Sequence, residues 1–482
     1  MAHAAAQFAA LEKTADRRLM SWLKLPRASH TVALSSALAF GIQIAFALLM
    51  LRLFTPQEVG EFSVLSQIGF FWMTLALAQA PLSLLANAHT PANQALRSAC
   101  RSSVLRGFAL LPVAALAVWL SDLALWPALM WVLLLGFFQM GNLLSQSHSL
   151  RAGGAWQQAA VRVLPPFTAA VFALAAAWLR QADTAHGLGL LSASGDLYDI
   201  PVLVIAAILG YAVGAAWLVP ALCQTPALPK HATEMAEGKT PSGVTAASME
   251  ASDASLHQQS DTRSATLRIA HTLADALLAT ALVVVWQRLY GAQETGWMTA
   301  LLRVLGFVPA VVHMAWAQVV LAQGAHEKQD IETHASAPSK NLLSTTRQRH
   351  HKAAVWLGLT AFSAVVVLGG VCALALNWQW LDARWEGVWA YIVPLVLWQG
   401  SACLSAAFSH RPFQTHAAAR YSWACMGLAL LQAVVLLAPL GFAQPMNAAQ
   451  HMLAFALVSS LGLVALTAWM ARLRETGLAS TA

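Results

Sequence analysis

The sequence predicts an all-α polytopic membrane protein with about twelve transmembrane helices in two parallel six-helix lobes. Composition, the spacing of apolar runs and an internal repeat predict this fold. Of the 482 residues, 58% are hydrophobic and only 10% are charged, whereas soluble domains carry about 25% charged residues. Since a water-soluble chain of this composition would lack the charges to cover its surface, the composition favours a membrane bundle.

Apolar runs long enough to cross a membrane recur twelve times along the chain. The hydrocarbon core of a bilayer is crossed by a helix of about 20 apolar residues. Ser121-Asp122 separates the third run from the fourth, and Pro165-Pro166 interrupts the fifth. The runs lie near 31–53, 62–86, 104–121, 123–147, 161–179, 200–222, 267–287, 297–322, 353–376, 388–409, 421–442 and 449–471.

The distribution of Lys and Arg predicts the topology. If the N-terminus is cytoplasmic, every Lys and Arg lies in an inside segment except Arg303 within a span and four outside residues, Arg52, Arg180, Arg288 and Arg384. This is the positive-inside rule, and it predicts a multi-pass protein of the bacterial inner membrane with both termini in the cytoplasm. Anionic lipids then explain the net charge of +7, without a nucleic-acid partner.

The expected domains follow from the same pattern. Residues 1–30 form a basic cytoplasmic segment, which is either an amphipathic helix on the inner leaflet or a solvated tail. Residues 31–222 form the N-lobe with helices one to six, and 267–471 form the C-lobe with helices seven to twelve. Between them, 223–266 is expected to be a flexible cytoplasmic linker. A second polar connection spans 323–352, and 472–482 is a cytoplasmic tail.

The sequence predicts no catalytic residue, metal site or cofactor. The five cysteines are scattered and have neither metal-ligand nor disulfide spacing. Gly238-Lys239-Thr240 resembles the end of a phosphate-binding loop, but Thr233 occupies the position of the first glycine and no strand precedes it. Seven tryptophans near span ends predict an aromatic belt at the membrane interface: Trp119, Trp126, Trp178, Trp378, Trp380, Trp385 and Trp389.

An internal repeat is the most informative pattern. The first copy is RLFTPQEVG (residues 52–60) and the second is RLYGAQETG (288–296), so six of nine positions match in type at an offset of 236. Because six helices separate the copies, both halves enter the membrane in the same direction, as a parallel repeat. We interpret each copy as a tight outer turn in which the glycine reverses the backbone and the Arg and aromatic side chains anchor at the interface.

The segment RLFTPQEVGEFSVLSQIGFF, with its echo RLYGAQETGWMTALLRVLGFVPAVV, resembles the polysaccharide-transporter branch of the multidrug/oligosaccharidyl-lipid/polysaccharide (MOP) exporter superfamily. The resemblance implies a MOP/MATE-like fold. It also implies a flippase of the O-antigen (Wzx) type, which moves undecaprenyl-diphosphate-linked oligosaccharide by alternating access. Implied partners are this lipid-linked glycan, membrane lipids, a polysaccharide polymerase and glycosyltransferases. The polar connections at 223–266 and 323–352 depart from the family pattern.

An anionic diphosphate head needs cationic or hydrogen-bonding groups along its path, and ionisable residues within spans are usually functional. Arg303 is expected to line the cavity, with Gln67 at the same position of the first half; the alternative is an arginine that snorkels to the interface. His313 either binds phosphate, carries a proton or bonds a neighbour. Asp275 either couples transport to an ion or pairs with His271 or Arg268.

Other polar residues have weaker functional interpretations. Arg52 and Arg288 lie at helix ends, where substrate contact competes with interfacial anchoring as an explanation. Several amides either line a wet groove or bond neighbouring helices: Gln43, Gln79, Gln139, Asn142, Gln318 and Gln399.

Three functions from different classes fit the sequence. The first is the flippase. The second is a drug or organic-cation exporter of the same fold, which would need acids in the first-half spans; the predicted spans one to six contain none. The third is a membrane-embedded polysaccharide-assembly enzyme using Glu58 or Glu61. Because Glu58 recurs as Glu294, a structural role in the turn is favoured there.

Overall fold

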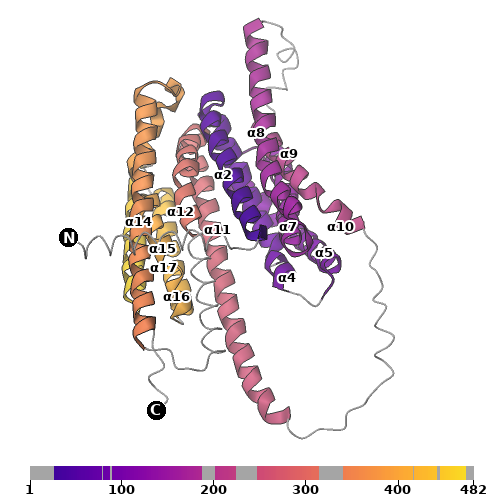
Figure 1. Cartoon of the computed structure of the whole chain (residues 1–482). Coiled ribbons are helices and arrows are strands. Elements are labelled where there is room, and N and C mark those ends of the chain that lie inside the picture. The colour runs from indigo at the N-terminus through magenta and orange to yellow at the C-terminus, as the bar shows by residue number, and fades with distance from the viewer. Residues whose placement is uncertain are drawn as a thin grey trace, which may run out of the picture. The chain divides into compact units, whose positions relative to one another are not determined.

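A computed structural model of the chain describes residues 27–78, 80–86, 90–186, 201–223, 247–313, 340–415, 417–441 and 446–473. Within these ranges the chain consists of helices and connections, without strands (Figure 1). The elements are α2 (Arg27–Leu53), α3 (Pro56–Leu77), α4 (Ala80–Ala86), α5 (Ala92–Ala109), α6 (Leu111–Leu120), α7 (Leu125–Ala152), α8 (Ala155–His186), α9 (Val202–Ala216), α10 (Val219–Cys223), α11 (Ala247–Leu305), α12 (Phe307–Val312), α14 (Lys340–Asn377), η2 (Ala383–Val388), α15 (Trp389–Phe408), α16 (Arg411–Gln414), α17 (Ala418–Leu437), η3 (Ala438–Gly441) and α18 (Ala448–Arg472).

These helices confirm the prediction of an all-α polytopic membrane protein. In the described part of the chain, eight helices are long and apolar enough to cross a membrane, and α5 with α6, bent by 49°, forms a ninth candidate. Two shorter apolar helices cover Gly41–Leu53 and Val202–Ala216. Each of the twelve predicted runs thus coincides with helical structure, although residues 314–322 of the eighth lie outside the described residues.

One apolar stretch contains two predicted spans. Ala270–Val312 is 43 residues long, which as a straight helix would measure about 65 Å, twice the ~30 Å of a hydrocarbon core. The stretch is instead two helices joined at Gly291, whose φ of 82° and ψ of 178° are not helical. Gly291 therefore separates the seventh and eighth predicted helices.

Several predicted boundaries differ from the structure. Helix α11 begins at Ala247, so the second part of the predicted 223–266 linker is helical; likewise α14 begins at Lys340, inside the predicted 323–352 connection. Helix α3 begins at Pro56, which places Glu58 and Glu61 inside the second helix. The expectation that the first-half helices contain no acid is therefore wrong. Residues 1–26, with the proposed amphipathic helix, lie outside the described residues.

The chain divides into two compact units. The first comprises Met1–Phe46, Ala76–Ala109 and Leu134–Pro226, and within it α8 packs along α9. Glycine permits this close packing, because a Cβ on Gly210 of α9 would lie 2.5 Å from the Pro165 carbonyl oxygen of α8. Pro165 and Pro166 lie inside α8 without ending it.

The second unit comprises Ala47–Leu75, Leu110–Leu133 and Ala227–Ala482. Helix α15 is its central helix and packs against α14 and α18, while α11 packs against α17. Tyr391 and Cys403 of α15 are fully buried. By contrast, Val367 of α14 is 63% exposed and Leu430 of α17 is 68% exposed. Large apolar side chains on outer helices are typical of a surface that faces lipid.

Contacts within each unit join connections that the charge pattern places on the same side. In the second unit, Arg384 donates to the carbonyl of Arg52, and both lie in predicted outside connections. In the first unit, Arg97 donates to the carbonyl of Leu222 at 2.8 Å, and both lie near predicted inside connections. These pairings support the alternating topology. Which side is cytoplasmic stays a prediction, as do the lobe boundaries.

The aromatic belt is exposed as predicted, with one correction. Trp385 is fully buried in the second unit, so it is a core residue and the prediction is wrong for it. The remaining six belt tryptophans are 47% to 78% exposed, as contact with a membrane interface requires: Trp119, Trp126, Trp178, Trp378, Trp380 and Trp389.

Candidate functional site

The two copies of the repeat pack against each other through their glycines. A Cβ on Gly60 would lie 1.9 Å from the carbonyl oxygen of Ala292, and a Cβ on Gly296 would lie 1.8 Å from that of Pro56. Gly60 and Gly296 are repeat mates, by which we mean residues related by the offset of 236, and so are Pro56 and Ala292. Each copy thus makes the same contact with the other, as in an interface with two-fold symmetry.

This packing corrects the role expected for the glycine that ends each copy of the repeat. Gly60 and Gly296 lie inside helices α3 and α11, and neither has a positive φ. They permit close approach of two helices and do not reverse the chain. In the second copy the reversal falls on Gly291, whose mate in the first copy is Thr55. Phe54 is 1% exposed, so the aromatic of the first copy belongs to the core and not to the interface anchor that we expected.

One turn further along these helices, two buried hydroxyls meet. The Oγ of Ser63 and the Oγ1 of Thr299 lie 2.9 Å apart and are hydrogen bonded. They too are repeat mates, separated by 236 residues, and they are 4% and 5% exposed. The hydroxyls therefore mark the point where equivalent positions of the helices that follow the two copies meet.

Arg303 lies at this contact. Its Nη2 donates to Ser63 Oγ at 3.0 Å, and its Nη1 lies 3.9 Å from Met50 Sδ. Its guanidinium carbon lies 4.5 Å from the centre of the Phe62 ring, within the range of a cation–π interaction. Arg303 thus extends from the helix that follows the second copy to α2 and α3, which contain Met50, Phe62 and Ser63. The hydrogen bond to Ser63 and the contact with the Phe62 ring together orient the plane of the Arg303 guanidinium.

Gln67, the repeat mate of Arg303, has a different partner. Its Nε2 lies 3.4 Å from Thr280 Oγ1, in the first helix of α11. Gln67 and Arg303 follow Ser63 and Thr299, respectively, by one helical turn. The two mates therefore lie on equivalent turns of the two copies, and each bonds a helix of the other half.

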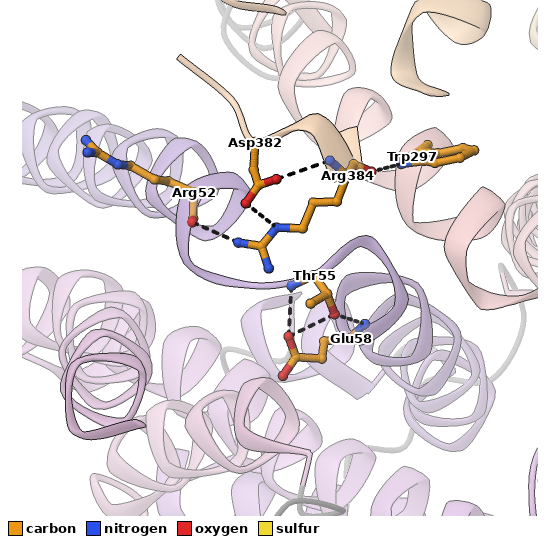
Figure 2. Close-up of polar contacts among 6 residues, drawn as sticks. All are labelled: Arg52, Thr55, Glu58, Trp297, Asp382 and Arg384. Atoms are coloured by element: carbon orange, nitrogen blue, oxygen red, sulfur yellow. Dashed lines mark hydrogen bonds and ion pairs between the residues drawn. The ribbon is translucent and has the colours of Figure 1, made fainter. Parts of the chain in front are cut away.

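The turn of the first copy is closed by a capping box. Glu58 accepts from the Thr55 backbone N–H at 2.8 Å, and Thr55 Oγ1 accepts from the Glu58 N–H at 3.2 Å, so each residue satisfies the other's donor. Figure 2 shows this pair below Arg384, whose Nη2 lies 3.5 Å from the carbonyl oxygen of Arg52. The structural role favoured for Glu58 is confirmed.

Arg384 ties a later connection to this turn. Its Nε lies 3.3 Å from Asp382 Oδ2, and its carbonyl accepts from Trp297 Nε1 at 2.9 Å. In Figure 2 the Arg52 side chain points away from this group, and only its carbonyl takes part. Arg288 instead pairs with Asp122 at 3.6 Å and lies 6.0 Å from the Trp119 ring centre. The structure thus does not bring Arg52 and Arg288 to Arg303.

In the second copy, Glu294 has a different partner from Glu58. It accepts from the hydroxyl of Tyr391 on α15, and the same hydroxyl accepts from Trp286 Nε1 at 3.2 Å. Trp286 stacks on the His451 ring at 4.7 Å between centres. His451 Nδ1 lies 3.0 Å from the Tyr290 hydroxyl. We call these five side chains the aromatic cluster; composition and spacing give no signal for it.

The remaining predicted residues pair locally. His313 Nδ1 lies 3.2 Å from Ser409 Oγ, which is the neighbour bond considered for it. Asp275 pairs with His271 at 3.2 Å and is 59% exposed, so the alternative of a pair with His271 is the one observed. Neither contact involves Arg303, Ser63 or Thr299.

The charge pattern assigns Arg162 of the first unit to an inside connection and gives no functional expectation for it. It lies within α8, and its Nη1 is buried without a hydrogen-bond partner in the described part of the chain. A buried cationic donor without a partner is costly, so this nitrogen is an unusual feature of the first unit. Its position eight residues into an apolar helix was the available signal.

Comparisons with known proteins give a structural likeness only. No protein-family profile matches the chain, and no curated protein matches it. Among solved structures, it is similar to an inward closed conformation of the lipid II flippase MurJ. The TM-score is 0.53 at 11% identity, over 90% of this chain and 86% of that one. It is also similar to an inward-facing multidrug resistance MATE family transporter of the MOP superfamily, with a TM-score of 0.40 and 12% identity over 90% and 93%. The first likeness establishes a shared fold.

Proposed function

We propose that this chain is a flippase that moves a polyprenyl-diphosphate-linked oligosaccharide, an O-antigen or exopolysaccharide unit, across the bacterial inner membrane. The observation that carries the proposal is the fold shared with a lipid II flippase over 90% of the chain. The resemblance of the repeat to polysaccharide transporters also supports a lipid-linked oligosaccharide as the substrate class. Polysaccharide polymerase and glycosyltransferases are the partners that would supply and consume this substrate.

The contact between the copies suggests how the transport cycle works. Arg303 donates to Ser63 in this state. A guanidinium is a fork of donors that matches phosphate oxygens, so a diphosphate head can replace the hydroxyl as its partner when the copies move apart. A ligand shifts a two-state equilibrium only through its different affinity for the two states. Arg303 bonds Ser63 in one state and the substrate phosphate in the other, and this change of partner provides the difference in affinity.

Leaflet-resolved measurement of the lipid-linked oligosaccharide in the native host tests the proposal. Deletion of the gene should trap the oligosaccharide in the cytoplasmic leaflet and remove it from the surface. Complementation with Arg303→Ala should restore less than a tenth of the wild-type flux, and Arg303→Lys should restore an intermediate flux. Arg101→Ala, at an exposed position of α5 in the first unit, is the matched control and should restore full flux. An unchanged leaflet distribution after deletion, in a host without a second flippase, would contradict the proposal.

A drug or organic-cation exporter is the second candidate, because α3 contains Glu58 and Glu61 within a helix. Glu58 serves as a helix cap, and Glu61 accepts from Gln57 at 3.2 Å. An exporter would change drug resistance on deletion and leave the lipid-linked oligosaccharide on its normal leaflets, so the same strain separates the two functions.

A further inference from the structure

A groove runs between α17 and α18, away from the contact between the copies. It has a volume of about 460 Å³ and is lined by Arg420, Ala424 and Leu428 of α17 and by Gly462, Ala465 and Trp469 of α18. Volumes of roughly 300–1,000 Å³ are typical of ligand sites. Every named lining residue except Arg420 and Trp469 is purely aliphatic or lacks a side chain, so the groove is apolar along most of its length.

Helix packing explains why the groove has one closed and one open end. At Gly462 the helices touch, since a Cβ there would lie 2.2 Å from Leu428 Cδ1. Beyond this contact Gln432 donates to Ser459 at 2.7 Å. In the other direction Ala424 and Ala465 are both exposed and too small to fill the space. The groove therefore opens toward Arg420 and Trp469.

Positive charge gathers at the open end. Arg420 is in the first turn of α17, and Arg472 is the last residue of α18, one turn beyond Trp469. Both arginines are exposed, and neither has a hydrogen-bond or ion-pair partner among the described residues. Arg411 nearby is already bound to the carbonyl of Ala471. Arg420 and Trp469 thus line the open end, and Arg472 follows Trp469 by one helical turn on α18.

We infer that this groove binds an anionic phospholipid, with the phosphate held by Arg420 and Arg472 and an acyl chain lying over Ala424 and Ala465. Basic sites between transmembrane helices bind anionic headgroups, and a tryptophan at such a site lies at headgroup depth. The neighbouring surface of α17 exposes Trp423 and Leu430, at 66% and 68%, as a helix in contact with lipid does. The site is separate from Arg303 and does not depend on the proposed transport function.

Native mass spectrometry of the delipidated full-length protein tests the inference. Phosphatidylglycerol and phosphatidylcholine with identical acyl chains are added in turn to wild type and to the Arg420→Ala/Arg472→Ala double variant. Wild type should bind phosphatidylglycerol at least fivefold more tightly than phosphatidylcholine, and the double variant should lose that preference. Arg101→Ala/Arg106→Ala, which removes two arginines from α5, is the matched control and should keep it.

A second variant tests the acyl chain. Ala465→Phe should fill the groove and weaken both lipids, whereas Ala468→Phe, at an exposed position of α18 that does not line the groove, should leave both unchanged. Thermal unfolding in detergent verifies that each variant folds. Equal binding of the two phospholipids by wild type, or an unchanged preference in the double arginine variant, would overturn the inference. Displacement of phosphatidylglycerol by an equimolar polyprenyl phosphate would also overturn it, because the groove would then hold the tail of a carrier lipid.

Discussion

Ser63 and Thr299 are hydrogen bonded at 2.9 Å although 236 residues separate them, and 236 is the offset of the sequence repeat. Equivalent positions can touch each other only on the axis that relates two copies. The hydrogen bond therefore locates this axis within the second unit, between α3 and the second helix of α11. It also explains why Gly60 faces Ala292 while its repeat mate Gly296 faces Pro56, the repeat mate of Ala292.

The first prediction concerns these glycines. Gly60→Ala and Gly296→Ala each place a Cβ within 2 Å of a backbone carbonyl oxygen. Backbone cannot move aside as a side chain does, so each variant should lose about 1–3 kcal/mol of stability. Thermal unfolding in detergent measures the loss. Gly370→Ala in α14 meets nothing within 4 Å and should be neutral or gain up to ~1 kcal/mol from helix propensity. Equal effects at all three positions would refute the close contact.

The second prediction concerns Ser63 and Arg303. A double-mutant cycle of Ser63→Ala and Arg303→Ala should show a coupling energy of about 0.5–3 kcal/mol in unfolding, as residues in contact do. Ser102→Ala with Arg303→Ala is the control pair and should be additive. A coupling below the error of the measurement would show that the 3.0 Å contact does not persist in the purified protein.

A third prediction tests movement between the copies. In a background without the five native cysteines, Ser63→Cys/Thr299→Cys should form a disulfide on oxidation. If the copies separate during transport, oxidation should stop the flux and reduction should restore it. Full flux in the oxidised, crosslinked protein would show that this contact stays closed throughout the cycle.

The fourth prediction compares Gly291 with Thr55, the residues that occupy the same turn position in the two copies of the repeat. Gly291 has φ 82° and ψ 178°, a region that is essentially restricted to glycine, so Gly291→Ala should cost about 1–3 kcal/mol. Thr55→Ala removes the cap at the equivalent position and should cost ~1 kcal/mol. Gly291→Thr restores the first-copy residue without its backbone conformation and should be no better than Gly291→Ala. Chemical denaturation monitored by tryptophan fluorescence gives the three values.

The fifth prediction concerns the aromatic cluster. Tyr391→Phe removes the hydroxyl shared by Trp286 and Glu294 and leaves both groups without that partner. A buried polar group without a partner costs about 1–3 kcal/mol, and thermal unfolding should show this loss. In a Trp286→Phe background, Tyr391→Phe should lower the unfolding free energy by less than it does in wild type. Strict additivity would indicate that the two side chains are not bonded.

The sequence was sufficient to predict the helices, because apolar length and charge asymmetry are properties of a single helix in a membrane. It was also sufficient to find the repeat. It did not predict that Gly60 packs against Ala292, or that Arg303 bonds Ser63, because such contacts depend on how distant helices cross. Glu58 and Glu294 occupy the same position of the repeat but have different partners. Glu58 caps its own helix, whereas Glu294 bonds Tyr391, which lies on α15, and no local sequence pattern predicts where α15 packs.

The geometry around Ser63 and Thr299 has a consequence for what a single chain allows. In a symmetric dimer of six-helix subunits, the residue at the position of Gln67 and Arg303 would occur identically on both sides of the axis. An arginine there would place two cations on equivalent turns, one helical turn from the same pair of hydroxyls, and like charges at short range repel. A single chain that carries both halves lacks that constraint, because the two positions can hold different residues, here Gln67 and Arg303. A single cation beside the axis is an arrangement that a symmetric dimer cannot encode.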